Sequence, residues 1–379
     1  MRKTVMTFIM AGGKGERLWP LTKDRTKPAV PFGGIYRIID FTLSNSINSG
    51  LRKIYVLTQY KSASLHRHIR LGWNILASEL GEYIELLPAQ QRVGETWYLG
   101  TADAIFQNLY TLELDKPEEV LILAGDHVYK MNYYSMIDFH RQVNADLTVG
   151  VVEMDKDYSP QLGVLEVDSV SRVKSFQEKP ANPKTVPAHP DKIYASMGIY
   201  VFKTPILENE LHEDALKTNS DHDFGKDIIP QMLRKGLKVA AYNFIDENKK
   251  EAKHWRDIGT IDAYFEANMD LVQVDPIFNL YDVEWPIRTY QEQFPPAKTV
   301  FAGEEITGRV GLVLDSLVSG GCIVSGGRVQ RSILSPNVRI NSYSQVYDSI
   351  LMEGVNVGRY AKIKRAIIDK DVDIPAGMV

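Results

Sequence analysis

Residues 4–18 read TVMTFIMAGGKGERL, a short apolar run that leads directly into a loop with three glycines. The run up to Ala11 predicts a buried β-strand, because it is too short for a signal peptide and lacks a small-residue cleavage site. Glycine lets backbone N–H groups approach an anion closely, so a glycine turn after a first strand often binds phosphate. The alternative is a simple strand-to-helix turn with solvated charges.

The order of the glycines matches neither of the two commonest phosphate-binding fingerprints. A dinucleotide fingerprint has the spacing G-x-G-x-x-G, and a P-loop has Ser or Thr directly after G-K. Here Gly12 and Gly13 precede Lys14, and Gly15 follows it. The loop is therefore neither of these two commonest types.

Three basic residues follow this loop at short intervals, at Arg17, Arg25 and Lys27. Cationic side chains that gather beside a glycine loop are suited to a ligand with several phosphate groups. The pattern therefore favours a triphosphate as the anion.

The composition is that of an ordinary globular protein. At roughly 150 residues per domain, the 379 residues suggest two or three domains. The net charge of −4 gives no general basic field for nucleic acid. The single cysteine, Cys322, permits no disulfide within the chain, which favours a reducing compartment. No apolar run approaches the ~20 residues of a membrane span, and we expect a cytoplasmic protein without nucleic-acid or membrane partners.

Up to about residue 275, short apolar runs alternate with helix-like stretches. Apolar strands separated by helices predict an α/β domain, residues 1–275, with a Rossmann-like and mainly parallel sheet covered on both faces. Ligands of such sheets bind at the carboxyl ends of the strands. The expected strands are 4–11, 53–58, 119–124, 146–152 and 198–202, and the expected helices are 43–49, 62–71, 102–114 and 133–143.

The last part of the chain, residues 301–379, has a different periodicity. Aliphatic residues recur at spacings of five or six and return to register every 17 residues, which no α-helix does. Near-six-residue repeats predict a left-handed parallel β-helix, in which one aliphatic side chain per side of each triangular coil points inward. The proline-rich residues 276–300 read as a linker. The expected inward positions are Ile306, Leu312, Leu317, Ile323, Val329, Leu334, Ile340, Val346, Leu351, Val357, Ile363, Ile368 and Ile374.

Three residues outside the glycine loop are suited to phosphate chemistry. Asp126 follows the run 119–124, and at the carboxyl end of a buried strand a carboxylate is well placed to hold a hard cation such as Mg²⁺. Asp257, in WRDIGT, is a second candidate, although a helix cap is the alternative for both aspartates. Their spacing does not show whether they converge. Lys179, before Pro180 in an extended segment, could reach a phosphate or be an ordinary surface lysine.

Taken together, these stretches resemble the glucose-1-phosphate adenylyltransferases, or ADP-glucose pyrophosphorylases, of bacterial glycogen synthesis, over nearly all of residues 4–379. Relatives that use UTP, GTP or dTTP share only the glycine loop, the GD step, EKP and the late Asp, whereas YLGTADA, RIIDF and SMGIYVF are typical of the adenylyltransferases. The motifs are AGGKGERL, RTKPAVPFGG, RIIDFTLSNSINSGLRKIYVLTQY, LLPAQQRVGETWYLGTADA, LAGDHVYK, EKPANP, ASMGIYVF, SDHDFGKDIIP, WRDIGT and LVSGGCIVSG.

The resemblance implies that ATP and glucose 1-phosphate react to give ADP-glucose and pyrophosphate, with Mg²⁺ as the cofactor. It assigns catalysis to Arg17, Lys27, Asp126 and Asp257, with both aspartates on the metal and Arg25 as a further candidate. The ATP-binding residues that it implies are Gly12, Gly13, Gly15, Arg17, one of Gln90 and Gln91, and Gly100 with Thr101. The residues that it implies for glucose 1-phosphate are Tyr98, Gly163, Glu178, Lys179 and Ser196.

The resemblance also implies a homotetramer controlled by metabolite effectors, and here the chain departs from the family. Many relatives have a lysine in an activation loop where this chain has Ile35, and relatives usually extend some tens of residues beyond Val379. Three other readings are a nucleotidyltransferase for another base or sugar, a regulatory subunit without chemistry, and an acyltransferase. Arg17, Asp126 and Lys179 weigh against the second. Acyltransferases with such a β-helix usually work through a histidine between the coils. The third reading is rejected because residues 300–379 contain no histidine.

Overall fold

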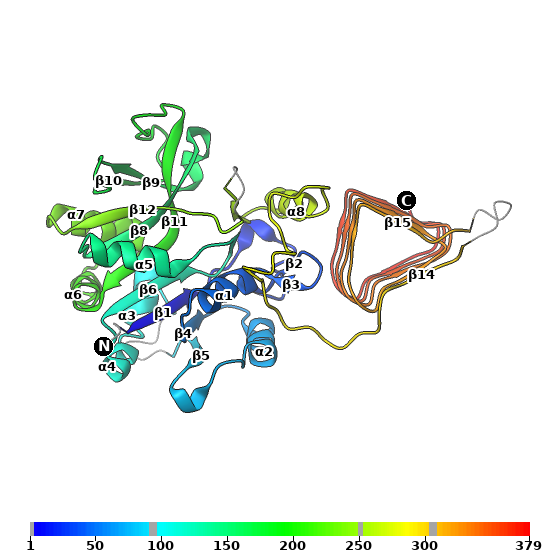
Figure 1. The fold of residues 1–379 in the computed structure, drawn as a ribbon, viewed down its shortest axis with the longest axis horizontal. Helices are drawn as coiled ribbons and strands as arrows, with labels where there is room; N and C mark the ends of the chain where they lie inside the picture. The colour runs from blue at the N-terminus through cyan, green and yellow to red at the C-terminus, as the bar shows by residue number, and fades with distance from the viewer. Residues whose placement is uncertain (1–3, 91–96, 249–252, 303–308) are drawn as a thin grey trace.

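The computed structural model describes residues 4–90, 97–248, 253–302 and 309–379 (Figure 1). The described chain forms a mixed sheet wrapped by helices and, beside it, a triangular stack of coils. None of the helices in these four ranges has the length and apolar character that crossing a bilayer requires.

The larger part is built on a nine-stranded sheet whose main path runs β10-β9-β11-β6-β1-β4-β5, with β8 and β12 attached through β11. Strands β6, β1, β4 and β5 are parallel, as expected, while β11 runs antiparallel to both β6 and β8. The strands are β1 (Val5–Met10), β4 (Lys53–Thr58), β5 (Tyr83–Pro88), β6 (Glu119–Ala124), β8 (Leu147–Asp155), β9 (Gly163–Val167), β10 (Val173–Glu178), β11 (Lys192–Lys203) and β12 (Val239–Asn243).

Both faces of this sheet are covered, which explains why its central strands are apolar along their whole length. Alternate residues of each strand enter opposite cores, so that Ile9 packs on one face and Phe8 on the other. The first face carries α1 (Ile38–Asn48), α2 (Ala63–Gly72) and α5 (Tyr133–Gln142); the second carries α3 (Thr101–Phe106), α4 (Tyr110–Asp115), α6 (Thr204–Ala215) and α7 (Ile229–Arg234). The helix expected over 102–114 is therefore two short helices.

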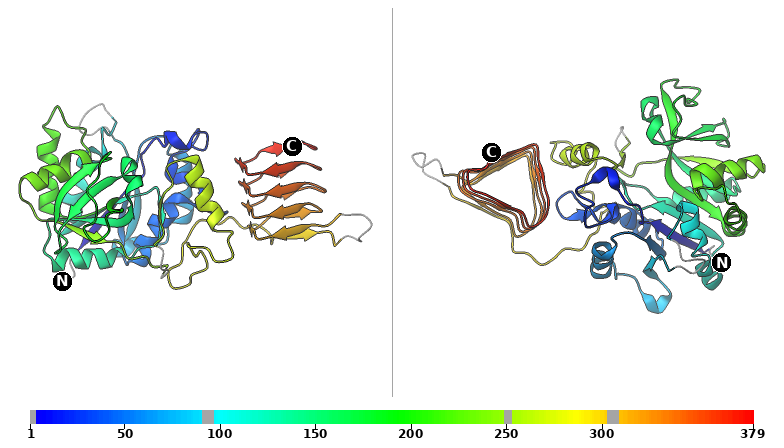
Figure 2. Two further views of the ribbon diagram at one scale, coloured as in Figure 1. Left: turned by 90° about the horizontal axis from the view of Figure 1, so that it is seen from above. Right: turned by 180° about the vertical axis from the view of Figure 1, so that it is seen from behind.

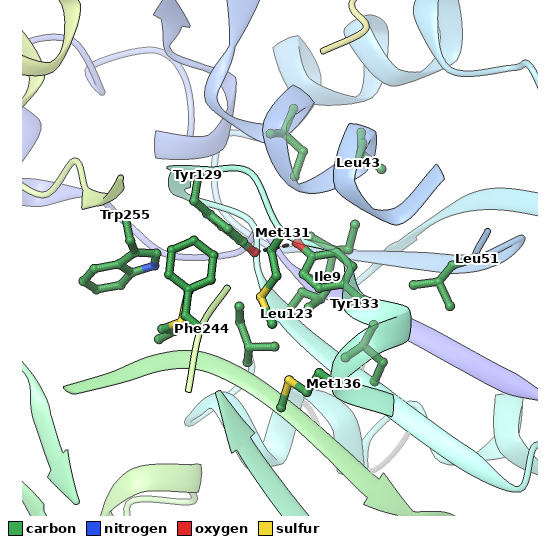
Figure 3. Packing of buried hydrophobic residues seen from close by; sticks show 14 of the residues in the cluster. Ile9, Leu43, Leu51, Leu123, Tyr129, Met131, Tyr133, Met136, Phe244 and Trp255 are labelled. Atoms are coloured by element: carbon green, nitrogen blue, oxygen red, sulfur yellow. Dashed lines mark hydrogen bonds between the residues drawn. The ribbon is translucent and has the colours of Figure 1, made fainter. Parts of the chain in front are cut away.

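Figure 3 shows part of the first core from close by. Ile9 and Leu123 of the sheet pack with Tyr129 and Tyr133, whose hydroxyl groups are 2.6 Å apart. Trp255 closes the same cluster. A rigid core of this kind fixes the segments that leave the strand ends.

The remaining elements of this part are short strands, short helices and the helix α8, which connect the main strands and helices. They are β2 (Pro31–Phe32), β3 (Tyr36–Arg37), β7 (His127–Tyr129), β13 (Trp255–Asp257), α8 (Ile261–Asp270) and the short helices η1 (Glu16–Leu18), η2 (Lys27–Ala29), η3 (Ser78–Leu80), η4 (Lys156–Gln161) and η5 (Phe224–Ile228).

The C-terminal part is a left-handed parallel β-helix, seen as a triangle in Figure 1 and as stacked coils in the left view of Figure 2. Three parallel sheets form its sides. The first contains β14 (Lys298–Val300), β17 (Ile323–Ser325), β20 (Arg339–Ile340), β23 (Asn356–Val357) and β26 (Asp373–Ile374); the second contains β15 (Leu312–Leu314), β18 (Arg328–Gln330), β21 (Gln345–Tyr347) and β24 (Lys362–Lys364); the third contains β16 (Leu317–Val318), β19 (Ile333–Leu334), β22 (Ile350–Leu351) and β25 (Ile367–Ile368).

The 17-residue register is confirmed from Val329 onward, where Val346 and Ile363 follow in line. It is wrong by one residue in the first described coil. There Val313, Val324 and Val318 align with Val329, Ile340 and Leu334, so the expected Leu312, Ile323 and Leu317 stand one position out of line. The repeat across this coil is 16 residues, and Ile306 lies outside the described residues.

The third side of the β-helix is apolar on both faces. Leu334 and Leu351 point into the coil stack, while the preceding Ile333 and Ile350 join a cluster with Leu18, Phe41 and other residues of the sheet part. The cluster is a core shared by the two parts of the chain, which packs the β-helix against the segments that carry the glycine loop. Its fully buried members include Leu18, Val30, Phe32, Ile38, Phe41, Val128, Ile258, Tyr264, Ile333 and Met352.

Candidate functional site

A two-stranded ribbon brings Asp126 and Asp257 together. Strand β13 pairs with β7 so that Asp257 lies opposite His127, the residue after Asp126. Gly125, which precedes Asp126, packs tightly, since a Cβ there would lie 2.8 Å from Ile39 Cδ1. Two carboxylates that are distant in the sequence thus face one another at the carboxyl edge of the sheet.

Lys27 bridges the two carboxylates. Its Nζ is 2.8 Å from Asp126 Oδ2 and 2.7 Å from Asp257 Oδ1, and its side chain is only 8% exposed. Burial works against the charged lysine, but the two aspartates outweigh it and raise the pKa of Lys27. Burial also works against the charged form of Asp126 and would raise its pKa. The positive charges of Lys27 and His127 outweigh this effect and lower the pKa of Asp126 to about 2. Lys27 and Asp126 are therefore both charged at neutral pH.

His127 is the member of this group that the sequence reasoning missed. Its Nε2 lies 3.5 Å from Asp126 Oδ1 and 3.9 Å from Asp257 Oδ1, and its ring packs edge-on against Trp255. One ligand atom from each of Asp126, His127 and Asp257 can lie within 4.8 Å of the others. The signal was its place in the Gly-Asp-His step, but only the pairing of β7 with β13 brings its side chain to Asp257.

The glycine loop leaves β1 and runs beside Lys27. Gly15 has a φ of +64°, and a Cβ there would lie 3.0 Å from Lys27 Cβ, so both backbone conformation and space call for glycine. A Cβ on Gly13 would meet nothing within 4 Å, which leaves its backbone open. Thr26 fixes the loop by donating from Oγ1 to the carbonyls of Ala11 and Gly13.

The two arginines near this loop have separate surroundings. Arg17 Nη2 lies 4.0 Å from Asp257 Oδ2, and its side chain is mostly exposed. Arg25 turns away and donates to Asp369 of the β-helix through both terminal guanidinium nitrogens, at 2.9 and 3.0 Å. The expected cluster of three cations is thus wrong for Arg25, because this residue ties the two parts of the chain together.

A cleft of about 560 Å³ opens over these groups. Asp126 and Lys27 line it on one side and the glycine loop on another, while Thr101 and Gly259 approach from elsewhere. The described residues that line it are Met10, Gly12, Gly13, Lys14, Gly15, Glu16, Arg17, Lys27, Pro28, Thr101, Ala124, Asp126 and Gly259.

The residues expected to read the base belong to two segments, one at the start of α3 and one after β5. Gly100 directly precedes α3, and a Cβ there would lie 2.3 Å from the carbonyl oxygen of His222, so packing already calls for glycine at this position. Thr101 donates to Asp223 Oδ2 at 2.9 Å and accepts from the Phe224 amide. Gln90 is exposed after β5, and Gln91 lies outside the described residues.

Two of the residues expected to hold the sugar phosphate lie side by side on neighbouring strands. Glu178 pairs with Gly163 across β10 and β9, and a Cβ on Gly163 would lie 3.2 Å from Glu178 Oε2. Lys179 Nζ lies 3.3 Å from Glu178 Oε1 and is mostly exposed. The expected extended backbone at Lys179 is wrong, because its φ is +49°.

Tyr98 and Ser196 approach from other elements. The Tyr98 hydroxyl accepts from Asn108 Nδ2 at 3.0 Å, and burial raises the pKa of Tyr98. Ser196 stands at an irregularity of β11 that ends at Tyr200. Gly198 lies inside this irregular segment, and a Cβ there would lie 3.4 Å from Ala124 Cβ and 3.9 Å from His127 Cε1. The segment therefore approaches His127, next to Asp126.

The pair of carboxylates formed by Asp126 and Asp257 fits a hard divalent cation. Asp126 and Asp257 offer oxygen ligands of the kind that Mg²⁺ takes, and Lys27 shows that the space between them holds positive charge. The arrangement combines a metal-binding carboxylate pair with a glycine loop and cations, which is the equipment for handling polyphosphates.

Comparison with known proteins agrees with this chemistry. Residues 6–274 match the family model described as nucleotidyl transferase, and residues 295–379 match the model described as GlmU-like C-terminal hexapeptide. A protein of Koribacter versatilis called glucose-1-phosphate adenylyltransferase is 57% identical over 98% of this chain and 88% of its own length. Proteins of the same name from Rhodopirellula baltica and Methylococcus capsulatus are 56% and 51% identical, over 99% and 100% of this chain and 84% and 88% of their own lengths.

The fold and the site define a nucleotidyltransferase with an appended β-helix. The chain belongs to the nucleotidyl transferase family and, within it, to the glucose-1-phosphate adenylyltransferases.

Proposed function

We propose that this protein transfers the adenylyl group of ATP to glucose 1-phosphate, giving ADP-glucose and pyrophosphate with Mg²⁺ as the metal. The observation that carries the proposal is the meeting of Asp126, Asp257 and Lys27 beside an open glycine loop in a chain whose relatives have this name. We propose a cytoplasmic location, where both substrates, a sugar phosphate and a nucleotide, would be available.

The chemical problem is repulsion, because a phosphate dianion must attack the α-phosphorus of a tetra-anion. Catalysis therefore consists of charge neutralisation and in-line positioning, and no protein nucleophile is needed. When bound, the metal would screen the phosphate oxygens of both reactants. Asp126 and Asp257 would hold it, with His127 lying against both carboxylates.

The cationic side chains and the backbone N–H groups bind the triphosphate. The backbone N–H groups of Gly12 and Gly13, together with Arg17 and Lys27, stabilise the charge that collects on the leaving pyrophosphate. Arg17 is free to swing toward that group, since its side chain is largely exposed.

The other side of the site receives the sugar phosphate. Lys179 grips the phosphate, and Glu178 accepts hydrogen bonds from sugar hydroxyls with Gly163, Ser196 and Tyr98 around it. The contact of Glu178 with Gly163 supports this grouping. One of Gln90 and Gln91, with the Gly100–Thr101 backbone, reads the adenine.

Pyrophosphate release tests the proposal. The purified protein should release pyrophosphate when given ATP, glucose 1-phosphate and Mg²⁺, and much less with UTP, GTP or dTTP. Asp126→Asn should abolish this turnover, because the ion loses a ligand, while Asp24→Asn, at an exposed residue before Arg25, should not. Equal rates with another nucleotide would redirect the assignment of the base, and near-normal kcat in Asp126→Asn would reject the carboxylate site.

We further propose a homotetramer under metabolite control, as the family resemblance implies. Ile35, where many relatives have a lysine, lines a cleft of about 600 Å³ between the sheet part and the β-helix. Sedimentation velocity tests the tetramer, and the pyrophosphate assay repeated with candidate sugar phosphates and nucleotides tests the control.

A further inference from the structure

The ammonium of Lys27 stands where a metal ion would need to be. It lies within 2.8 Å of one oxygen on each of Asp126 and Asp257. Mg²⁺ binds carboxylate oxygens at about 2.1 Å, so an ion and this ammonium cannot share the same two oxygens. The Asp126 oxygen that faces away from Lys27 lies 3.5 Å from His127 Nε2, so an ion that uses both carboxylates must still displace the ammonium from Asp257 Oδ1 or from Asp126 Oδ2.

The base of the Lys27 side chain lies against the glycine loop. A Cβ on Gly15 would touch Lys27 Cβ at 3.0 Å, and the backbone here is fixed because Thr26 binds the carbonyls of Ala11 and Gly13. The four-carbon side chain of lysine is flexible. It can therefore turn between the carboxylates and a phosphate at the loop without any movement of the backbone.

We propose that Lys27 keeps free divalent cations off the Asp126–Asp257 pair in the substrate-free enzyme and leaves the pair for the phosphates when the nucleotide binds. The reason is charge. A buried ammonium that abandons both carboxylates without a new anionic partner is strongly disfavoured, and a triphosphate supplies that partner. The metal then enters with the nucleotide and not before it. This inference rests on the metal site of the proposed function.

Direct binding of Mn²⁺ tests the inference without turnover. Mn²⁺ takes the same oxygen ligands as Mg²⁺, and its free concentration is read from the EPR signal in titrations of the whole protein without nucleotide. The proteins compared are the wild type, Lys27→Met, Lys27→Gln, Lys14→Met and the double variant Lys27→Met/Asp257→Asn. Lys14 is the matched control, because it belongs to the same loop and its ammonium pairs only distantly with Glu16, at 3.9 Å.

Removing the ammonium should tighten Mn²⁺ binding at least tenfold in both Lys27→Met and Lys27→Gln, and adding Asp257→Asn should abolish the gain. The Lys14→Met protein should bind within about threefold of the wild type, the range left for long-range charge effects in water. Unchanged affinity in both Lys27 variants, with circular dichroism showing that they are folded, would overturn the inference. So would a gain that survives Asp257→Asn.

The proposed function is checked separately by pyrophosphate release from the wild type. Normal Mg²⁺-dependent turnover together with unchanged Mn²⁺ affinity in the Lys27 variants would reject only the role of Lys27 in keeping the metal out. Absence of turnover in the wild type would reject the function itself.

Discussion

His254 should make the protein lose stability in mild acid. This residue precedes β13, which carries Asp257; it is 3% exposed, and its ring packs on Phe278 with the centroids 4.9 Å apart. Its Nε2 has no hydrogen-bond partner among the described residues. Burial, with a smaller effect of Arg256, lowers the pKa of His254 to about 3.

The sign and size of the effect follow from proton linkage. Histidine in an unfolded chain has a pKa near 6.5, so below that pH the unfolded state binds a proton that the native state refuses. The free energy of unfolding then falls by about 1.4 kcal/mol per pH unit, down to the folded pKa near 3. Between pH 7.5 and pH 5.5 the expected loss is about 1.4 kcal/mol.

Urea unfolding at pH 7.5 and pH 5.5, followed by tryptophan fluorescence, measures this loss. All other groups titrate in both proteins, so the difference in pH dependence between the wild type and His254→Leu isolates the histidine. The variant should lose about 1.4 kcal/mol less than the wild type. His189→Leu is the control, because His189 is largely exposed. An identical pH dependence in the wild type and His254→Leu would refute the reasoning.

Three further perturbations address the site and its support. Lys179→Ala should raise KM for glucose 1-phosphate at least tenfold, or about 1.4 kcal/mol, with KM for ATP little changed, whereas the exposed Lys184→Ala should alter neither; the reverse pattern in steady-state kinetics would reject the assignment. Gly15→Ala must adopt a φ of +64° and crowd Lys27, so KM for ATP should rise, and an unchanged value would show that the loop conformation does not matter. Ile350→Ala should cost about 2–5 kcal/mol of stability in thermal unfolding, and a loss below about 1 kcal/mol would contradict the shared core.

Periodicity could predict the β-helix but not the phase of its first described coil. That coil contains the apolar pairs Leu312–Val313, Leu317–Val318 and Ile323–Val324, and either member of each pair suits a hydrophobic interior. Hydrogen-bonded alignment with the next coil decides in favour of the second member. In the later coils the residue before the inward one is polar on two of the three sides, as at Arg328, Arg339 and Gln345, so the phase is unambiguous there. Only the third side keeps an apolar pair, whose first member faces the sheet part.

At the site, the sequence could predict single residues better than their arrangement. The end of the run 119–124 predicted Asp126 as a candidate metal ligand, because ligands of such sheets bind at the carboxyl ends of the strands. The partner of Arg25 could not be predicted, since Asp369 is 344 positions away and only the docking of the β-helix brings it near. His127 was missed for a similar reason, because its role depends on the pairing of β7 with β13.

The two-faced side of the β-helix has a consequence for how the gene can be cut and how it changes over time. A recombinant fragment that ends before residue 300 would expose Phe41 and its apolar neighbours, and one that starts after residue 300 would expose Ile333 and Ile350. Such fragments should aggregate on expression. Over generations, a bulkier side chain on one side should survive only when a smaller one appears opposite, so the halves of this enzyme are bound to diverge in step.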